Sequence, residues 1–278
     1  FITDVEHDEA YDEELVFTEN NVDTTNTQNS YFVEKVINDV ITDLTEKAGY
    51  NKSIATQMVY GGGLKIYSTV DAKVQKAMEE VFENEASFPK TSGDVKPESA
   101  MVITDPYTGE VKGIVGGRGK KSGSMVLNRA TQSPRQPGSS IKPLSVYGPG
   151  IDTGKVTQYT VIKDEPININ GWTPKNYDGT FEGSMTVMRA LQKSQNIPAI
   201  NILQMVGVDR SYEYLTQKMH FTTLDENDRN LAALALGGMT RGVTVYEMAA
   251  AYSVFPNKGV YNKPKTYTKV TDSTGKII

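Results

Sequence analysis

Residues 135–143 read Arg-Gln-Pro-Gly-Ser-Ser-Ile-Lys-Pro, and the interpretation of the whole chain depends on this stretch. Its Pro-Gly pair predicts a turn, and a helix beginning at Ser139 would place Lys142 on the same face, three residues further on. Gly138 has no side chain to obstruct a substrate, and the N-terminus of such a helix directs free backbone N–H groups towards the group that Ser139 attacks. These features suit an acyl-transfer nucleophile beside an amine. Ser-x-x-Lys alone is a weak signal, because it occurs by chance in many soluble proteins.

A second motif, Ser194-Gln195-Asn196, lies in a predicted break between two helices, about fifty residues after Lys142. A serine and an asparagine two positions apart in such a break direct both side chains into the same opening. The hydroxyl can pass a proton on, and the amide can donate to a carbonyl. Serine and asparagine are also ordinary helix caps, so this motif is weak by itself. It gains weight because it follows Ser-x-x-Lys in the chain.

The composition of the 278-residue chain is that of a globular protein, with 38% hydrophobic and 23% charged residues. This length can bury a substantial core as one large domain with an appendage or as two small domains. The chain has no cysteine, and its two histidines, His7 and His220, are far apart in sequence. Disulfides and thiol chemistry are therefore excluded, a Ser-His-Asp triad is disfavoured, and we expect neither a metal nor a cofactor. The net charge of −5, with nine acidic and no basic residues among the first 23, disfavours a nucleic-acid partner.

Hydrophobic periodicity and capping residues predict a chain of alternating helices and strands. The expected helices cover 1–17, 31–47, 52–60, 72–84, 185–193, 198–205, 210–219 and 244–255. The expected strands cover 64–68, 100–104 and 110–115, with a further hairpin starting at 265–270. Polar or turn-rich segments are expected as loops over 18–30, 87–98 and 151–183.

With both motifs in place, the chain resembles the transpeptidase domain of the class A, bifunctional penicillin-binding proteins. The family's Ser-x-x-Lys and Ser-x-Asn signatures correspond to Ser139 with Lys142 and to Ser194 with Asn196. Further similar segments cover 63–71, 128–132, 135–143, 189–199, 247–252 and 257–261. The resemblance implies an α/β penicillin-binding-protein/serine β-lactamase-like fold, in which an antiparallel sheet is flanked by helices.

The resemblance also implies how the chain is divided. Residues 1–17 resemble the tail of a glycosyltransferase domain that this chain lacks, 18–62 an interdomain linker region, and 63–278 a transpeptidase domain truncated before the family's Lys-Thr/Ser-Gly motif. That motif should follow Ser-x-Asn, but the only similar triplet, at 121–123, precedes the nucleophile, and we interpret it as a decoy. We expect the missing strand, which in the family borders the cleft and binds the substrate carboxylate, as a separate chain or a remainder outside these residues.

The family's chemistry implies a role for each motif residue. Ser139 attacks the penultimate D-Ala carbonyl of a peptidoglycan stem peptide, and an amine of a neighbouring stem then takes the acyl group. Lys142 can accept the serine proton only when neutral; because the ordinary pKa of lysine is about 10.4, burial and the helix N-terminus must lower it. Ser194 relays the proton to the leaving amine, and Asn196 binds an amide carbonyl of the donor and holds Lys142. β-Lactam antibiotics, which resemble D-Ala-D-Ala, acylate Ser139.

Two further expectations and two alternatives accompany this interpretation. Trp172 is a candidate for substrate binding, although core packing explains it equally well, as it does Tyr147 and Tyr177. The protein is expected at the extracytoplasmic face of the bacterial cytoplasmic membrane, anchored by a transmembrane helix outside this chain, since no apolar run here is long enough to span a bilayer. Two alternatives stay open: a serine β-lactamase-like hydrolase, although Glu165 precedes Ser-x-Asn where that class places its glutamate after it, and a non-catalytic scaffold or binding fragment.

Overall fold

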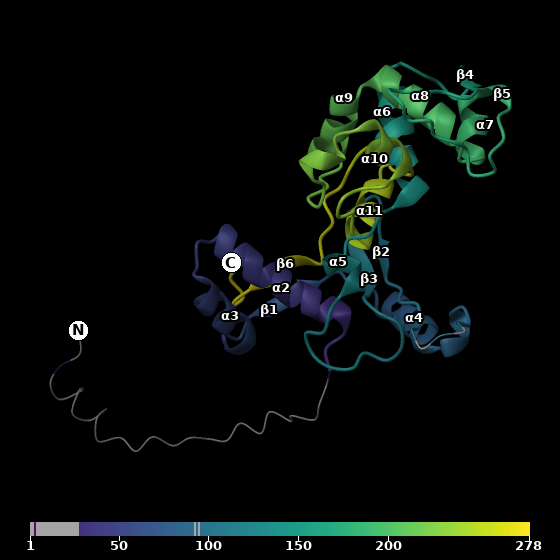
Figure 1. Cartoon of the computed structure of the whole chain (residues 1–278). Helices are drawn as coiled ribbons and strands as arrows, with labels where there is room; N and C mark the ends of the chain where they lie inside the picture. The colour runs from purple at the N-terminus through teal and green to yellow at the C-terminus, as the bar shows by residue number, and fades with distance from the viewer. Residues whose placement is uncertain (1–2, 4–27, 92, 94) are drawn as a thin grey trace.

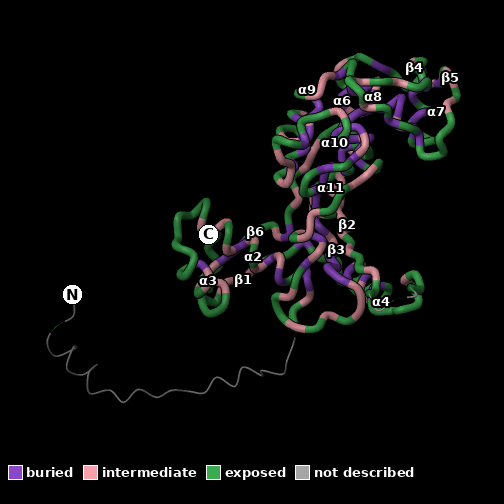
Figure 2. Tube along the Cα trace, in the orientation of Figure 1, coloured by how far each residue is buried: buried purple, intermediate pink, exposed green. Residues whose placement is uncertain are grey.

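The computed structural model describes residue 3, residues 28–91, residue 93 and residues 95–278. These residues form two lobes (Figure 1), and buried residues occur in both (Figure 2). The buried apolar side chains form two clusters, one in each lobe. We call them the lower lobe and the upper lobe, after their places in Figure 1. The helix expected over 1–17 and most of the loop expected over 18–30 lie outside the described residues.

The lower lobe combines four helices, one of them the short α5, with two antiparallel strand pairs, β2 with β3 and β1 with β6. The chain returns to this lobe at its end, because β6 pairs with β1 with Ile66 opposite Val270. The elements are α2 (Tyr31–Glu46), α3 (Lys52–Gly61), β1 (Lys65–Ser68), α4 (Ala72–Glu83), a 3-10 turn (Glu85–Ser87), β2 (Met101–Thr104), β3 (Val111–Val115), the short α5 (Arg129–Gln132) and β6 (Tyr267–Thr271).

Two helices of the lower lobe each bury a phenylalanine in place of the neighbouring valine that the apolar period favours. The period of the sequence places Val33 of α2 and Val81 of α4 on the buried face, but they are 40% and 52% exposed. Phe32 and Phe82, their neighbours in sequence, are buried instead, at 0% and 5% exposure. Burying a phenyl ring removes more apolar surface from water than burying an isopropyl group, so the aromatic neighbour takes the core position in each helix.

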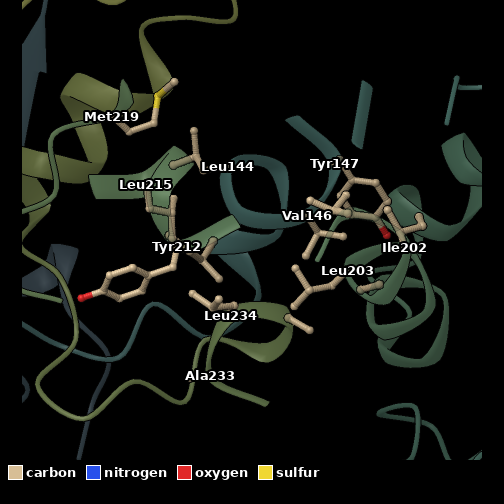
Figure 3. Close-up of a cluster of buried hydrophobic side chains, with 14 of the residues drawn as sticks. Leu144, Val146, Tyr147, Ile202, Leu203, Tyr212, Leu215, Met219, Ala233 and Leu234 are labelled. Carbon is tan, nitrogen blue, oxygen red and sulfur yellow. The ribbon is translucent and has the colours of Figure 1, made fainter. Parts of the chain in front are cut away.

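The upper lobe is mostly helical and packs around the residues that follow Lys142. Figure 3 shows Leu144 and Val146 in this core together with Leu203 and Leu234 from later helices. The elements are a 3-10 turn (Gly138–Ile141), a π turn (Pro143–Tyr147), α6 (Gly148–Asp152), β4 (Val161–Asp164), β5 (Gly183–Thr186), α7 (Val187–Gln192), α8 (Asn196–Val206), α9 (Val208–Glu213), a π turn (Tyr214–Lys218), a 3-10 turn (Glu226–Asp228), α10 (Leu231–Leu236) and α11 (Val245–Tyr252).

Several local predictions in the second half of the chain are wrong. The expected loop over 151–183 contains β4, which pairs with β5 where a helix start was expected at Met185. Helix α10 was not predicted, because its sequence Leu-Ala-Ala-Leu-Ala-Leu is apolar on every side and shows no amphipathic period. The strand near 265–270 does turn back as expected, with an antiparallel bridge between Thr271 and Ile277, but its main partner is β1, which was not predicted.

Within the part of the chain that the structure describes, no helix combines the length and the apolar character that crossing a bilayer requires. The longest, α2, has 16 residues.

A buried ion pair ties α2 to the loop that precedes α5. Glu34 Oε1 accepts hydrogen bonds from Lys121 Nζ at 2.7 Å and from the backbone N–H of Met125 at 2.6 Å. The side chains of Glu34 and Lys121 are only 7% and 10% exposed, and Lys121 also donates to the carbonyl of Gly123. The Lys-Ser-Gly triplet at 121–123 therefore has a structural role in the lower lobe.

We expect Glu34→Ala to lower the free energy of unfolding by about 3 kcal/mol, because it leaves the Lys121 ammonium buried without its counter-charge. Urea unfolding followed by circular dichroism measures this loss. Glu46→Ala, on the exposed surface of the same helix, is the matched control and should change stability by less than about 0.5 kcal/mol. Equal stability of the two variants would contradict the assigned role of the ion pair.

Candidate active site

The nucleophile candidate lies on a tight helical turn. Residues Gly138–Ile141 form a 3-10 turn that starts after Pro137, with Gly138 at φ 56°. A 3-10 helix has three residues per turn, so residues i and i+3 are eclipsed, and Ser139 and Lys142 lie on the same side. The expected common face is thus achieved by a tighter helix than the predicted α-helix. Ser139 is exposed to solvent, whereas Lys142 is completely buried.

The ammonium group of Lys142 is surrounded by the second motif. Its Nζ donates to the backbone oxygen of Ser194 at 2.7 Å and to Asn196 Oδ1 at 2.8 Å, and it lies 3.4 Å from Ser194 Oγ and 3.3 Å from the backbone oxygen of Gln195. Ser194 adopts a left-handed conformation, with φ 53°, that ordinary residues rarely adopt. This turn directs two successive carbonyl groups and a side-chain hydroxyl at one amine.

Burial controls the protonation of this amine. Removing Lys142 from water disfavours its charged form and lowers its pKa to about 8. The oxygens that accept its hydrogen bonds belong to amides, which are uncharged and stabilise an ammonium less than a carboxylate would. Lys142 can therefore exchange a proton near neutral pH, as a general base must. Of the two causes expected to lower this pKa, burial is the one that acts here.

The model of the family described as penicillin binding protein transpeptidase domain matches residues 99–277. The chain belongs to this family. Penicillin-binding protein 1A of Clostridium acetobutylicum is 37% identical over an alignment 265 residues long, which covers 89% of this chain and 32% of that protein. Penicillin-binding protein 1F of Bacillus subtilis is 36% identical over 237 residues, 85% of this chain and 32% of that protein. The chain thus spans about a third of the length of these relatives, and the predicted family is confirmed.

Solved structures of penicillin-binding proteins share the fold. Penicillin-binding protein 1A of Haemophilus influenzae matches with a TM-score of 0.69 at 23% identity, covering 100% of this chain and 52% of that one. The PonA1 protein of Mycobacterium tuberculosis, in complex with penicillin V, matches with a TM-score of 0.72 at 20% identity, covering 88% of this chain and 64% of that one. The predicted transpeptidase fold is confirmed.

The hydrogen-bond partners of Lys142 among the described residues do not include the other candidate residues. Trp172 is partly buried against the upper core, and its backbone pairs with Ile169, so its part in substrate binding stays a prediction. Tyr147 is a core residue, whereas the side chain of Tyr177 is fully exposed. Glu165 is exposed and pairs with Lys163 at 3.3 Å, as expected of a loop residue. Among the described residues, no group of acidic and histidine side chains could hold a metal ion.

Gly237, which lets the turn that carries Ser139 pack against the end of α10, was not predicted from the sequence. Gly237 follows α10 at φ 78°, and a Cβ atom at this position would lie 2.0 Å from the carbonyl oxygen of Gly138. Nearby, Arg135 and Val243 exchange two backbone hydrogen bonds of 2.9 Å. A Gly-Gly pair directly after an apolar run was the available signal. The backbone that follows α10 therefore packs against the turn that carries Ser139 and supports it.

We expect Gly237→Ala to cost at least about 2 kcal/mol of folding free energy, because it adds a left-handed alanine and a clash with backbone. Gly238→Ala is the matched control, since a Cβ atom there would have no heavy atom within 4 Å. Chemical denaturation of both variants measures the difference. The packing argument is wrong if Gly237→Ala is as stable as Gly238→Ala.

Proposed function

We propose that this chain carries the acylation centre of a peptidoglycan D,D-transpeptidase that β-lactams also acylate. The observation that carries the proposal is the buried Lys142 Nζ, 2.8 Å from Asn196 Oδ1 and 3.4 Å from Ser194 Oγ, one 3-10 turn from the exposed Ser139. Lys142, Ser194 and Asn196 are the kinds of polar side chain that serine acyl transfer with a lysine base requires. Membership of the penicillin-binding protein transpeptidase family supports the same reaction.

In the first half-reaction, Ser139 Oγ attacks the penultimate D-Ala carbonyl while neutral Lys142 takes the hydroxyl proton. The carbon–nitrogen bond to the terminal D-Ala breaks, and the proton passes from Lys142 through the Ser194 hydroxyl to the leaving amine. The backbone N–H of Ser139 stabilises the oxyanion, and each such donor contributes about 3 kcal/mol in comparable sites. The products are a Ser139 ester and free D-Ala.

In the second half-reaction, an amine of a neighbouring stem peptide attacks the ester, and its proton returns to Ser139 Oγ through the same groups. An amide cross-link forms and the free serine is restored. Asn196 holds an amide carbonyl of the donor peptide, and Trp172 contributes to substrate binding. A β-lactam enters the first half-reaction only, because its leaving amine stays attached to the acyl group and blocks the second.

The family resemblance implies a further motif for the proposed site. The family's Lys-Thr/Ser-Gly strand would bind the substrate carboxylate and supply a second oxyanion donor. Among the described strands β2 pairs with β3 alone, so its other edge is where additional strands would extend the sheet. We propose residues 63–278 as the transpeptidase part and 18–62 as a linker region, in a protein anchored at the extracytoplasmic face of the cytoplasmic membrane.

We expect a fluorescent penicillin to label the folded chain covalently, and Ser139→Ala to abolish the label, because only Ser139 carries the attacking oxygen. Gel fluorescence and peptide mass spectrometry measure the extent and the position of labelling. Ser140→Ala is the matched control: its hydroxyl is equally exposed but donates to the carbonyl of Pro137, and it should retain at least half of the label.

Three outcomes would count against the proposal. A folded wild-type chain that takes up no label would refute the site assignment and support a non-catalytic scaffold. Label retained in Ser139→Ala would place the nucleophile elsewhere. Rapid loss of the label would indicate a β-lactamase-like hydrolase, for which the chain offers no carboxylate beside Lys142 in the contacts that the described residues make.

The rate of acylation should rise about tenfold between pH 7 and pH 9, because neutral Lys142 is the reactive form and its pKa is about 8. Below that pKa most of the amine is protonated, and above it the neutral form predominates. Stopped-flow measurement of β-lactam acylation across this range tests the slope. Lys142→Arg, whose guanidinium stays charged, should show no acylation at either pH. A rate that is constant or falls with increasing pH would contradict Lys142 as the base.

A further inference from the structure

A buried asparagine from the loop between β4 and β5 reaches the first turn of α8. Asn176 is 4% exposed, and its Oδ1 accepts hydrogen bonds from the backbone N–H groups of Asn196 at 2.9 Å and Ile197 at 3.2 Å. Its Nδ2 donates to Asp164 Oδ1 at 2.7 Å and to the carbonyl of Thr180 at 2.8 Å. All four hydrogen-bonding positions of this amide are occupied.

Asn176 replaces the cap that α8 lacks in its own sequence. The first N–H groups of a helix have no partner inside the helix, and the residue before it usually provides one. In α8 that residue is Gln195, whose side chain makes no capping hydrogen bond. Asn176, twenty positions earlier, provides the acceptor instead.

Asp164 determines which way the Asn176 amide faces. The Asp164 carboxylate is completely buried, and its second oxygen accepts from the backbone N–H of Glu182 at 2.9 Å. An ionised carboxylate can only accept hydrogen bonds, so the amide must turn its NH₂ group towards Asp164 and its oxygen towards α8. The two residues therefore act as one support between β4 and the start of α8.

This support ends at the residues that surround Lys142. The oxygens that accept from Lys142 Nζ come from Ser194, Gln195 and Asn196, the last three positions up to the start of α8. The backbone carbonyl of the neighbouring Lys175 accepts a hydrogen bond from Asn196 Nδ2 at 2.8 Å. The same loop therefore holds both the backbone and the side chain of Asn196. A displaced helix start would move every one of these oxygens relative to Lys142.

We infer that Asn176, oriented by Asp164, is a positioning residue that holds the Ser194–Asn196 segment against Lys142. The inference rests on the proposed function, because the geometry it maintains is that of the acylation centre. Asn176 acts through other groups and contacts neither the reacting hydroxyl nor the base. Its loss should admit water to Lys142, which raises the pKa of that amine and reduces the neutral form available near pH 7.

The main test compares Asn176→Ala with wild type in two measurements. The acylation rate with a fluorescent penicillin at pH 7 should fall at least tenfold, and the midpoint of its pH profile should move upward. NMR titration of Lys142, enriched with ¹³C in lysine, should show the same upward movement without requiring activity. Asn168→Ala is the matched control: Asn168 is exposed in the same loop and accepts only from Gly171 at 2.8 Å, so both measurements should match wild type.

If Asn176→Ala does not fold, a second test exchanges the asparagine and aspartate between positions 176 and 164. Asn176→Asp alone places two carboxylates together and should acylate slowly. Adding Asp164→Asn restores a donor between the two positions, while the carboxylate introduced by Asn176→Asp can still accept from α8. The acylation rate of the double variant should therefore be at least threefold higher than that of Asn176→Asp. A double variant no better than the single one would overturn the assigned role of Asp164.

The results separate this inference from the proposed function. If wild type acylates and Asn176→Ala has the same rate and pH midpoint, the positioning role is overturned and the transpeptidase proposal stands. If folded wild type does not acylate, the proposed function fails. The inference is then tested by the NMR titration of Lys142 alone. An unchanged Lys142 midpoint in Asn176→Ala overturns it, whereas a raised midpoint supports it.

Discussion

The structure around the site depends on burying one amine. Lys142 lies between Ile141 and Leu144 in a core where both apolar neighbours are almost completely enclosed. A charged lysine in such a place must either lose its proton or find oxygen acceptors, and this chain provides conditions for both. The acceptors come from a segment 52 to 54 positions later, so the fold of the upper lobe is needed to complete the environment of a single side chain.

The sequence predicted best what short-range geometry controls. Ser139 and Lys142 are related by one helical turn, and the helix expected from residue 244 begins there, with Thr244 and Glu247 forming a capping box. Prediction failed where distant parts of the chain decide. β6 pairs with β1, about 200 residues away, and nothing in the Lys265–Val270 pattern identifies that partner. The capping of α8 by Asn176 was also invisible, because a side chain from a distant loop replaces a local signal.

Position in the fold, rather than residue identity alone, distinguishes a functional motif from a chance match. The Lys-Ser-Gly triplet at 121–123 matches a family motif in letters, but its lysine is neutralised by Glu34 in the lower lobe. Lys142, by contrast, has only uncharged acceptors and a pKa lowered to about 8. The environment of Lys142 therefore favours loss of a proton, whereas the Lys121 side chain is held in an ion pair.

Helix α11 joins the two lobes at the nucleophile. Tyr246 packs against the lower core, whereas Met248 and Ala251 belong to the upper core, so the helix contributes to both. At its end, Tyr252 donates from its hydroxyl to the carbonyl of Ser140 at 2.6 Å, beside the exposed Ser139. The nucleophile turn is thus held by α10 on one side and by a helix anchored in both lobes on another. Because a shift of one lobe relative to the other would pull on this hydroxyl, the position of Ser139 depends on the packing of the lower lobe as well as the upper one.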